Sequence, residues 1–198
     1  IGTPENVAPS VGPIEVQFGD QIITVQRPII YKFTDPAIGE IYEPLVIAPP
    51  VTASFSETAV VFNGNEPKDF PVQLRNFKAG SKGTLRPVVP AGWTVVPARI
   101  EFDFAEAGAT ESLNFKVTPS GKLDTGTFSL QIDTDGKTYQ QGFKEIVESH
   151  IPRQTLFPSA EVKLARADLK FGGKRIAYLG GAGDLVPESL KEIGYEVV

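Results

Sequence analysis

Side chains that could do chemistry are few in this chain of 198 residues. It contains no cysteine and a single histidine, His150. A catalytic zinc site takes about three protein ligands, usually histidine, cysteine or carboxylate, and a Ser-His-Asp hydrolase needs its histidine beside a serine. No Gly-x-Ser-x-Gly motif is present either. We therefore expect no catalytic residue, and we interpret His150 as a linker residue rather than a metal ligand.

Three aspartates near the end of the main apolar region form a second candidate site. They are Asp124, Asp133 and Asp135. Calcium prefers carboxylate oxygens, so a calcium site is one interpretation of this group. Aspartate is also common in solvated turns, where its side chain bonds to the backbone. We favour the turn interpretation and predict no bound metal.

A glycine-rich segment, residues 180–183, has the composition of a phosphate-binding loop. It lies between an expected strand at 175–179 and an expected helix at 184–193, where backbone amides can face a phosphate. The spacing differs from Gly-x-Gly-x-x-Gly, because Leu185 and Val186 occupy the place of the later glycine. We interpret the segment as a structural turn and expect no cofactor.

Exposed aromatic side chains can stack on sugar rings, and the one tryptophan, Trp93, is the best candidate for such a contact. Tyr139 and Phe143 are the other aromatic residues that we consider for a carbohydrate-binding surface. A tryptophan in a β-sandwich more often fills the core. We favour the core for Trp93 and keep carbohydrate contact as the alternative.

The composition excludes two classes of partner. The apolar fraction of 41% and the charged fraction of 22% are those of a globular protein. Nineteen basic and twenty-four acidic residues give a net charge of −5 without any basic run, so we expect no nucleic-acid partner. No apolar stretch approaches the roughly 20 residues that span a bilayer, so we expect no membrane span.

Four runs of alternating apolar residues predict the main fold. Period-two alternation indicates strands that each bury one face. With Asp135-Gly136 as a tight hairpin turn, about seven short strands predict an immunoglobulin-like antiparallel β-sandwich in a mainly β chain. The runs are Phe70, Val72, Leu74; Ile100, Phe102, Phe104; Leu113, Phe115, Val117; and Phe128, Leu130, Ile132.

Additional strands are expected before the sandwich, and a different pattern follows it. Residues 14–18 alternate, Gly19 and Asp20 offer a turn, and Pro28 interrupts the next strand. Near the C-terminus we expect a short, truncated β-α-β segment with Asp184 as the helix N-cap. The predicted organisation is an N-terminal β segment at 1–50, the sandwich at 51–147, an extended linker at 148–170 and the start of a truncated α/β domain at 171–198.

Part of the sandwich region resembles the NEW3 domain, an immunoglobulin-like module associated with alpha-galactosidases and other carbohydrate-active enzymes. The shared pattern is Gly-Trp-Thr-Val-x-Pro, then Phe-x-Val-Thr-Pro, then Gly-Thr-Phe. The resemblance implies an immunoglobulin-like fold and an accessory role. It is carried by residues 70–74, 91–97, 112–119 and 125–130.

Other stretches resemble the middle of large bacterial proteins of the PIG-L (LmbE-like) deacetylase family. In these proteins a zinc-dependent de-N-acetylase domain precedes sandwich modules and a flavodoxin-like or amidotransferase-like domain. The family's His-Pro-Asp-Asp metal motif is absent here, so the resemblance transfers no catalytic residue. The stretches are residues 26–44, 152–158, 174–179 and 183–190.

These observations lead to one functional expectation and two alternatives. We expect a non-catalytic accessory or interaction module of a larger multidomain carbohydrate-active enzyme, outside the cytoplasm, whose partners are neighbouring domains of the same polypeptide. The whole protein would then be a zinc-dependent N-acetylglucosaminyl deacetylase, as the PIG-L resemblance implies. A carbohydrate-binding module that uses surface aromatics is the alternative. An enzyme with paired carboxylates ranks last, because no acidic pair stands out.

Overall fold

The computed structural model describes residues 8–120, 125–148, 150–151, 153–170, 172–181 and 185–198. The chain divides into two compact units. The hairpin unit comprises Ile1–Ala48 and Lys144–Leu156, and the sandwich unit comprises Pro49–Phe143 and Phe157–Val198.

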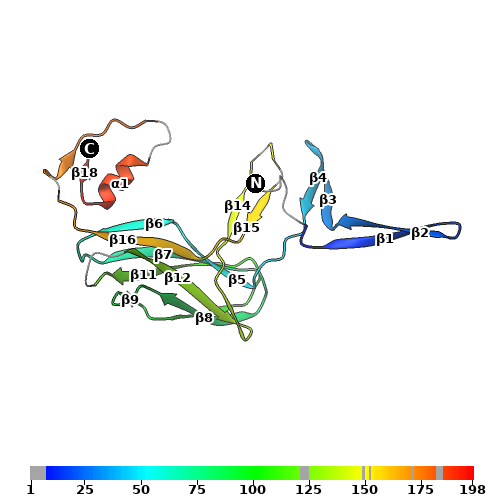
Figure 1. The fold of residues 1–198 in the computed structure, drawn as a ribbon, viewed down its shortest axis with the longest axis horizontal. Coiled ribbons are helices and arrows are strands. Elements are labelled where there is room, and N and C mark those ends of the chain that lie inside the picture. The colour runs from blue at the N-terminus through cyan, green and yellow to red at the C-terminus, as the bar shows by residue number, and fades with distance from the viewer. Residues whose placement is uncertain (1–7, 121–124, 149, 152, 171, 182–184) are drawn as a thin grey trace. The chain divides into compact units, whose positions relative to one another are not determined.

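The sandwich unit contains two packed sheets, and the first has four antiparallel strands (Figure 1). Its order corresponds to the A-B-E-D sheet of immunoglobulin domains. Along the sheet the strands are β5 (Val51–Phe55), β7 (Lys68–Asn76), β11 (Thr110–Thr118) and β9 (Thr94–Val96).

The second sheet contains the strands that correspond to C, F and G of an immunoglobulin domain. They are flanked by one strand on each side, and all pairs are antiparallel except β16 with β6, which is parallel. The predicted fold class, a mainly β chain with an immunoglobulin-like sandwich, is confirmed. The order is β10 (Ile100–Phe104), β8 (Ser81–Val88), β12 (Thr125–Thr134), β16 (Glu161–Ala167) and β6 (Ala59–Asn63), with β13 (Lys137–Tyr139) also paired to β12.

The alternating residues make the core between these sheets. Phe115 from the first sheet packs edge-on against Phe128 from the second, with ring centroids 6.1 Å apart. Both side chains are fully buried. Each such burial contributes about 1.5–3 kcal/mol, and close packing of many of them is what fixes the two sheets face to face.

The predicted hairpin at the end of β12 is also confirmed. Asp135 and Gly136 both have positive φ, 52° and 71°, as a two-residue type I′ turn requires. Ile132 pairs with Tyr139 across the turn, so β12 and β13 are antiparallel as expected.

The expected linker at residues 148–170 differs most from the structure. Its second half is β16, a strand in the interior of the second sheet with Val162 and Leu164 in the core. The alternation there is short, with the small side chain of Ala160 followed by Val162 and Leu164, and Pro158 stands just before it, so the pattern alone does not indicate a strand. Between β13 and β16 the chain forms a separate hairpin, β14 (Lys144–Ile146) with β15 (Gln154–Leu156).

The hairpin unit contains three two-stranded antiparallel ladders among its described residues. The expected turn at Gly19-Asp20 and the break at Pro28 are both observed, because the second strand ends at Pro28. Besides β14–β15, the ladders are β1 (Val11–Phe18) with β2 (Gln21–Pro28) and β3 (Ile30–Asp35) with β4 (Gly39–Pro44).

The expected β-α-β segment lies at the end of the sandwich unit. It comprises β17 (Arg175–Ile176), α1 (Val186–Glu192) and β18 (Glu196–Val197), and the two strands pair in parallel. The expected N-cap, Asp184, lies outside the described residues. None of the described residues belongs to a helix with the length and apolar character needed to cross a bilayer.

Candidate functional site

One face of the β1–β2 hairpin is an apolar surface. In an antiparallel ladder, two residues directly opposite each other point to the same side. Ile14 pairs with Val25 and Val16 pairs with Ile23, and Phe18 follows on the same side because side chains alternate along a strand. We call these five residues the apolar face. All five side chains are exposed.

The opposite face of this hairpin is mixed, with polar residues at its centre and the apolar Val11, Pro13, Pro28 and Ile22 towards its ends. Glu15 pairs with Thr24, and Gln17 pairs with Ile22. Ile22 and Ile23 are consecutive residues of the same type that point to opposite sides, with exposed fractions of 63% and 49%. The apolar face is therefore the more continuous apolar side of the hairpin, and neither side is buried within its own unit.

A hairpin that leaves a continuous apolar face open is unusual. The five side chains together leave on the order of 500 Å² of apolar area uncovered, a size at which surface patches commonly serve binding. A single two-stranded hairpin is at best marginally stable in water without packing on an apolar face. The apolar face is consequently the candidate interaction surface of this chain.

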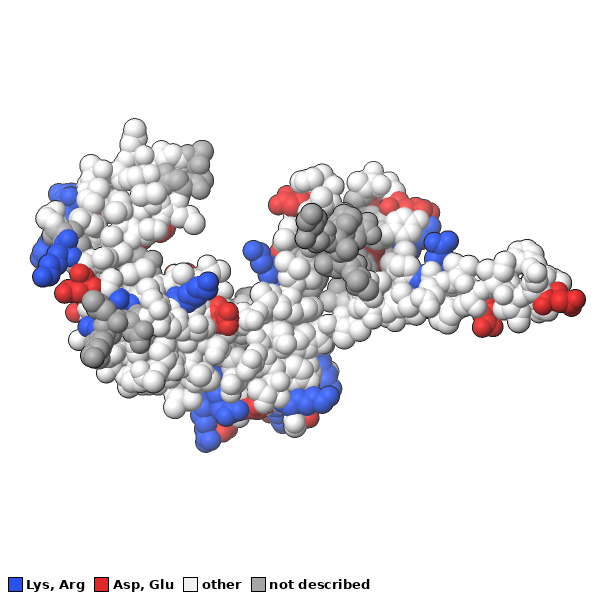
Figure 2. Space-filling model, in the orientation of Figure 1, with Lys and Arg blue, Asp and Glu red and all other residues white. Residues whose placement is uncertain are grey.

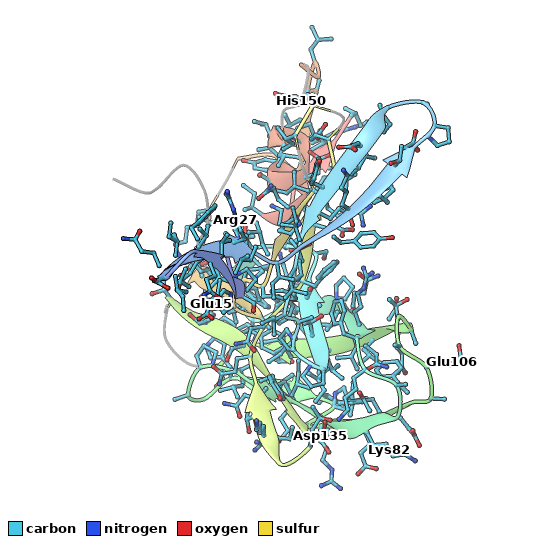
Figure 3. All side chains as sticks on the ribbon, turned by 90° about the vertical axis from the view of Figure 1, so that its right-hand side faces the viewer. Glu15, Arg27, Lys82, Glu106, Asp135 and His150 are labelled. Atoms are coloured by element: carbon cyan, nitrogen blue, oxygen red, sulfur yellow. The ribbon has the colours of Figure 1, made fainter. Side chains whose placement is uncertain are left out.

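Charges stand at the two ends of the hairpin. Arg27 lies near its open end, opposite Gly12 in the ladder and on the side of the apolar face, and Asp20 lies in the turn at its other end. Figure 2 shows the hairpin between them as largely uncharged surface. Glu15 and Arg27 are both labelled on this hairpin in Figure 3. The hairpin thus has opposite charges at its ends, and the one charged residue near its centre, Glu15, lies on the face opposite to the apolar face.

A second polar surface covers the outer side of β8, β10 and β12 in the sandwich unit. Lys82 Nζ lies 2.7 Å from Asp103 Oδ2, and Arg86 Nε donates to Asp133 Oδ2 at 2.6 Å. The Arg86 guanidinium, followed by the Thr138 hydroxyl, lowers the pKa of Asp133 below its usual value. These pairs are largely exposed, and exposed ion pairs contribute little to stability.

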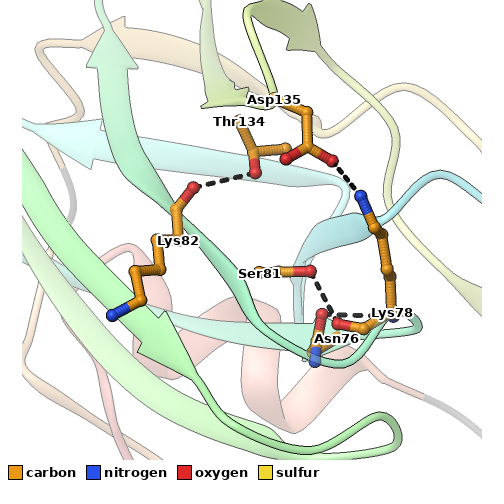
Figure 4. Close-up of polar contacts among 6 residues, drawn as sticks. All are labelled: Asn76, Lys78, Ser81, Lys82, Thr134 and Asp135. Carbon is orange, nitrogen blue, oxygen red and sulfur yellow. Dashed lines mark hydrogen bonds and ion pairs between the residues drawn. The ribbon is translucent and has the colours of Figure 1, made fainter.

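The aspartates considered as calcium ligands are engaged in such pairs. Lys78 Nζ donates to Asp135 Oδ2 at 2.6 Å (Figure 4), and Asp133 accepts from Arg86 and Thr138. Asp124 lies outside the described residues. Within the ranges that the structure describes, no group of three or more His, Cys, Asp or Glu side chains is placed to hold a metal ion. Asp135 lies in the turn, as the turn interpretation predicts, whereas Asp133 lies in β12 and that interpretation is wrong for it.

A hollow of about 410 Å³ lies between β8 and β10. Gly83 lies beneath it, where an added Cβ would come within 2.1 Å of the Asp133 carbonyl oxygen. Lys82 and Asp103 line it and pair with each other. Its other lining residues are Thr84, Glu101 and Phe102.

Trp93 belongs to the core. Only 7% of its surface is exposed, and its ring meets Phe62 edge-on with centroids 5.0 Å apart. This burial agrees with the favoured core interpretation and corrects the alternative of a sugar contact, because the indole has no open face on which a sugar could stack. Tyr139 and Phe143 are half-buried: Tyr139 packs against the core, and Phe143 stacks under Arg75. The three aromatic residues do not gather into a binding platform.

The sequence alone does not predict the contacts of Phe143, the residue just before β14, with the rest of the sandwich unit. Phe143 N–H donates to Ser54 Oγ at 2.9 Å, and the same hydroxyl donates to the Phe143 carbonyl at 3.2 Å. The Arg75 guanidinium carbon lies 4.3 Å from the centre of the Phe143 ring, and Phe77 and Phe157 complete an aromatic cluster. Residues 89 positions apart cannot be paired by local periodicity.

The remaining predicted candidates have no site around them. His150 is exposed in a turn between β14 and β15. The nearby Arg153 lies 3.5 Å from Glu145 and 3.8 Å from Glu43, which joins this hairpin to β4 within the hairpin unit. Of the glycine-rich segment, Gly180 and Gly181 are described as irregular backbone, and residues 182–183 lie outside the described ranges.

Comparisons with known proteins give no family. No protein-family model matches the chain, and no curated protein matches it. The NEW3 and PIG-L resemblances therefore have no support from these comparisons.

Part of this chain is similar in structure to two solved structures. A structure of Salmonella alpha-2-macroglobulin reacted with methylamine is 13% identical over 74% of this chain and 10% of that chain, with a TM-score of 0.41. The native conformation of E. coli alpha-2-macroglobulin is 13% identical over 74% of this chain and 9% of that chain, with a TM-score of 0.39. The chain thus spans about a tenth of these proteins, and similarity at this level assigns no function.

Proposed function

We propose that this chain is a non-catalytic interaction module of a larger multidomain protein, and that the apolar face of β1–β2 is the surface it uses. The observation that carries this proposal is the exposure of five apolar side chains on one side of a two-stranded hairpin. Burying about 500 Å² at roughly 25 cal/mol per Å² contributes on the order of 12 kcal/mol before the costs of association. The sandwich supplies a stable body that carries this surface.

The sequence resemblance supports a finer proposal. The larger protein would be a PIG-L-type de-N-acetylase located outside the cytoplasm, and this module would lie outside its zinc-containing domain. The purified chain should then show no hydrolysis of N-acetylglucosamine oligosaccharides. Turnover by the purified chain that persists after removal of trace metals would contradict a non-catalytic role.

Two neighbouring isoleucines provide the test of the interaction surface. Ile23→Glu places a charge on the apolar face, and Ile22→Glu places the same charge on the opposite face of the same strand. In the full-length protein, Ile23→Glu should make residues 11–28 markedly more sensitive to limited proteolysis, because the partner surface is lost. Equal sensitivity in the two variants would contradict the proposal.

A further inference from the structure

We propose that the partner of the apolar face is a second copy of this chain, packed face to face and antiparallel about a two-fold axis. This inference rests on the proposed function, because it names the partner of the same surface. A two-fold pair uses one patch twice, so the patch must be complementary to itself. Three properties of the hairpin meet that requirement.

The first property is the spacing of the charges. Asp20 and Arg27 are seven residues apart on β2 and its turn, or about 23 Å at 3.3 Å per residue. The midpoint between them falls next to Ile23, which pairs with Val16 at the centre of the apolar face. An axis through this pair brings Asp20 of one copy beside Arg27 of the other, at both ends of the interface.

The second property is the shape of the apolar face. With the axis at Val16 and Ile23, the row of Ile14 and Val25 in one copy lies over the row of Phe18 and Gln21 in the other. Phe18 is the largest and most exposed of the five residues, at 64%. At each end the Phe18 ring therefore meets Ile14, and Gln21 meets Val25, an arrangement that places no two rings against each other.

The third property is area and net charge. Two copies of a patch of about 500 Å² bury about 1,000 Å² in total, which is the lower limit for a specific interface. The hairpin carries Glu15, Asp20 and Arg27 as its charged residues, a net charge of −1, so two copies repel each other only weakly. An interface of this size predicts a weak dimer, with a dissociation constant on the order of 10 μM.

Sedimentation velocity of the 198-residue chain, from about 1 to 200 μM, tests this inference. We expect reversible dimerisation, weakened on the order of 100-fold or more by Ile23→Glu. The control Ile22→Glu should leave dimerisation unchanged. A monomer at all concentrations, or equal effects of the two variants, would overturn the two-fold pair.

A charge exchange tests the antiparallel arrangement. Arg27→Glu and Asp20→Arg should each weaken the dimer about threefold to tenfold, and the double variant Asp20→Arg/Arg27→Glu should restore it, since exposed ion pairs are worth up to about 1 kcal/mol each. Absence of restoration would overturn the antiparallel geometry. Circular dichroism and thermal unfolding of each variant show that the sandwich remains folded.

The same isoleucine pair separates this inference from the proposed function. In one outcome the isolated chain is monomeric, and Ile23→Glu alone increases proteolysis of residues 11–28 in the full-length protein. That result would overturn the second copy as the partner and would still support an interaction module. Should neither experiment distinguish Ile23→Glu from Ile22→Glu, both proposals fall.

Discussion

Ser54 and Phe143 bind each other through two hydrogen bonds, although they lie 89 positions apart in the sequence. The serine hydroxyl accepts from the Phe143 amide and donates to the Phe143 carbonyl. Ala53 N–H also donates to the Gln141 carbonyl at 3.1 Å, so the segment before the β14–β15 excursion follows the edge of β5. These hydrogen bonds hold residues 141–143 along β5, just before the chain passes into β14.

Replacing the serine tests this contact. Ser54→Ala leaves the partly buried amide and carbonyl of Phe143 without these partners, so the free energy of unfolding should fall by about 1–3 kcal/mol. Ser56→Ala, at an exposed position just after β5, is the control and should change stability by less than about 0.5 kcal/mol. Chemical denaturation of the three proteins measures both values, and equal stability of Ser54→Ala and the unmodified chain would contradict the role of the hydroxyl.

Gly83 should tolerate no side chain. An added Cβ would lie 2.1 Å from the Asp133 carbonyl oxygen on the neighbouring strand and 2.7 Å from the Phe102 ring. Gly83→Ala must therefore push β8 away from β12, which costs about 1–3 kcal/mol or more. Gly172→Ala meets nothing within 4 Å and is the matched control. A melting temperature of Gly83→Ala equal to that of Gly172→Ala would show that β8 and β12 are farther apart than described.

Trp93 should act as a core residue and as an internal probe. Trp93→Ala should destabilise the sandwich by about 3–5 kcal/mol, whereas Trp93→Phe retains much of the packing and should cost less. The fluorescence of the one tryptophan should be that of a buried indole and should not change when oligosaccharides are added. A saturable change on titration with any glycan would return carbohydrate binding to consideration.

Acid should weaken the sandwich through Asp133. Arg86 and Thr138 lower the pKa of Asp133 in the folded state, so the folded protein holds this proton less tightly than the unfolded chain does. The resulting stabilisation is present above the unfolded pKa of about 3.9 and is lost as pH falls through the folded value. Asp133→Asn should flatten the dependence of unfolding free energy on pH below about 4. Asp168→Asn, at another exposed position, is the control, and identical pH profiles for the two variants would contradict the assignment.

The sandwich strands were predictable from the sequence, but their partners were not. Phe70, Val72 and Leu74 alternate with polar residues, which is enough to predict a strand with one buried face. Alternation does not state which strands are neighbours. The sequence of β16 predicts a linker, because its alternation after Pro158 is short, and its place between β12 and β6 depends on contacts distant in sequence.

Sequence periodicity is equally insufficient to identify the apolar face as a candidate interaction surface. The alternation of Ile14, Val16 and Phe18 predicts a strand with an apolar side, and the turn at Gly19-Asp20 predicts its hairpin. The usual inference is that such a side is buried, yet the structure leaves it open within its unit. Periodicity describes a strand and carries no information about what covers it, so this surface was found only in three dimensions.

Hydrogen–deuterium exchange of the β1–β2 backbone tests the central claim most directly. The comparison is between the 198-residue chain, diluted far below the expected dissociation constant, and the full-length protein at high concentration. We expect markedly slower exchange across Val11–Phe18 and Gln21–Pro28 in the second sample, because the apolar face is then covered. Equal exchange rates in the two samples would show that this face remains open to solvent and would contradict its role as an interaction surface.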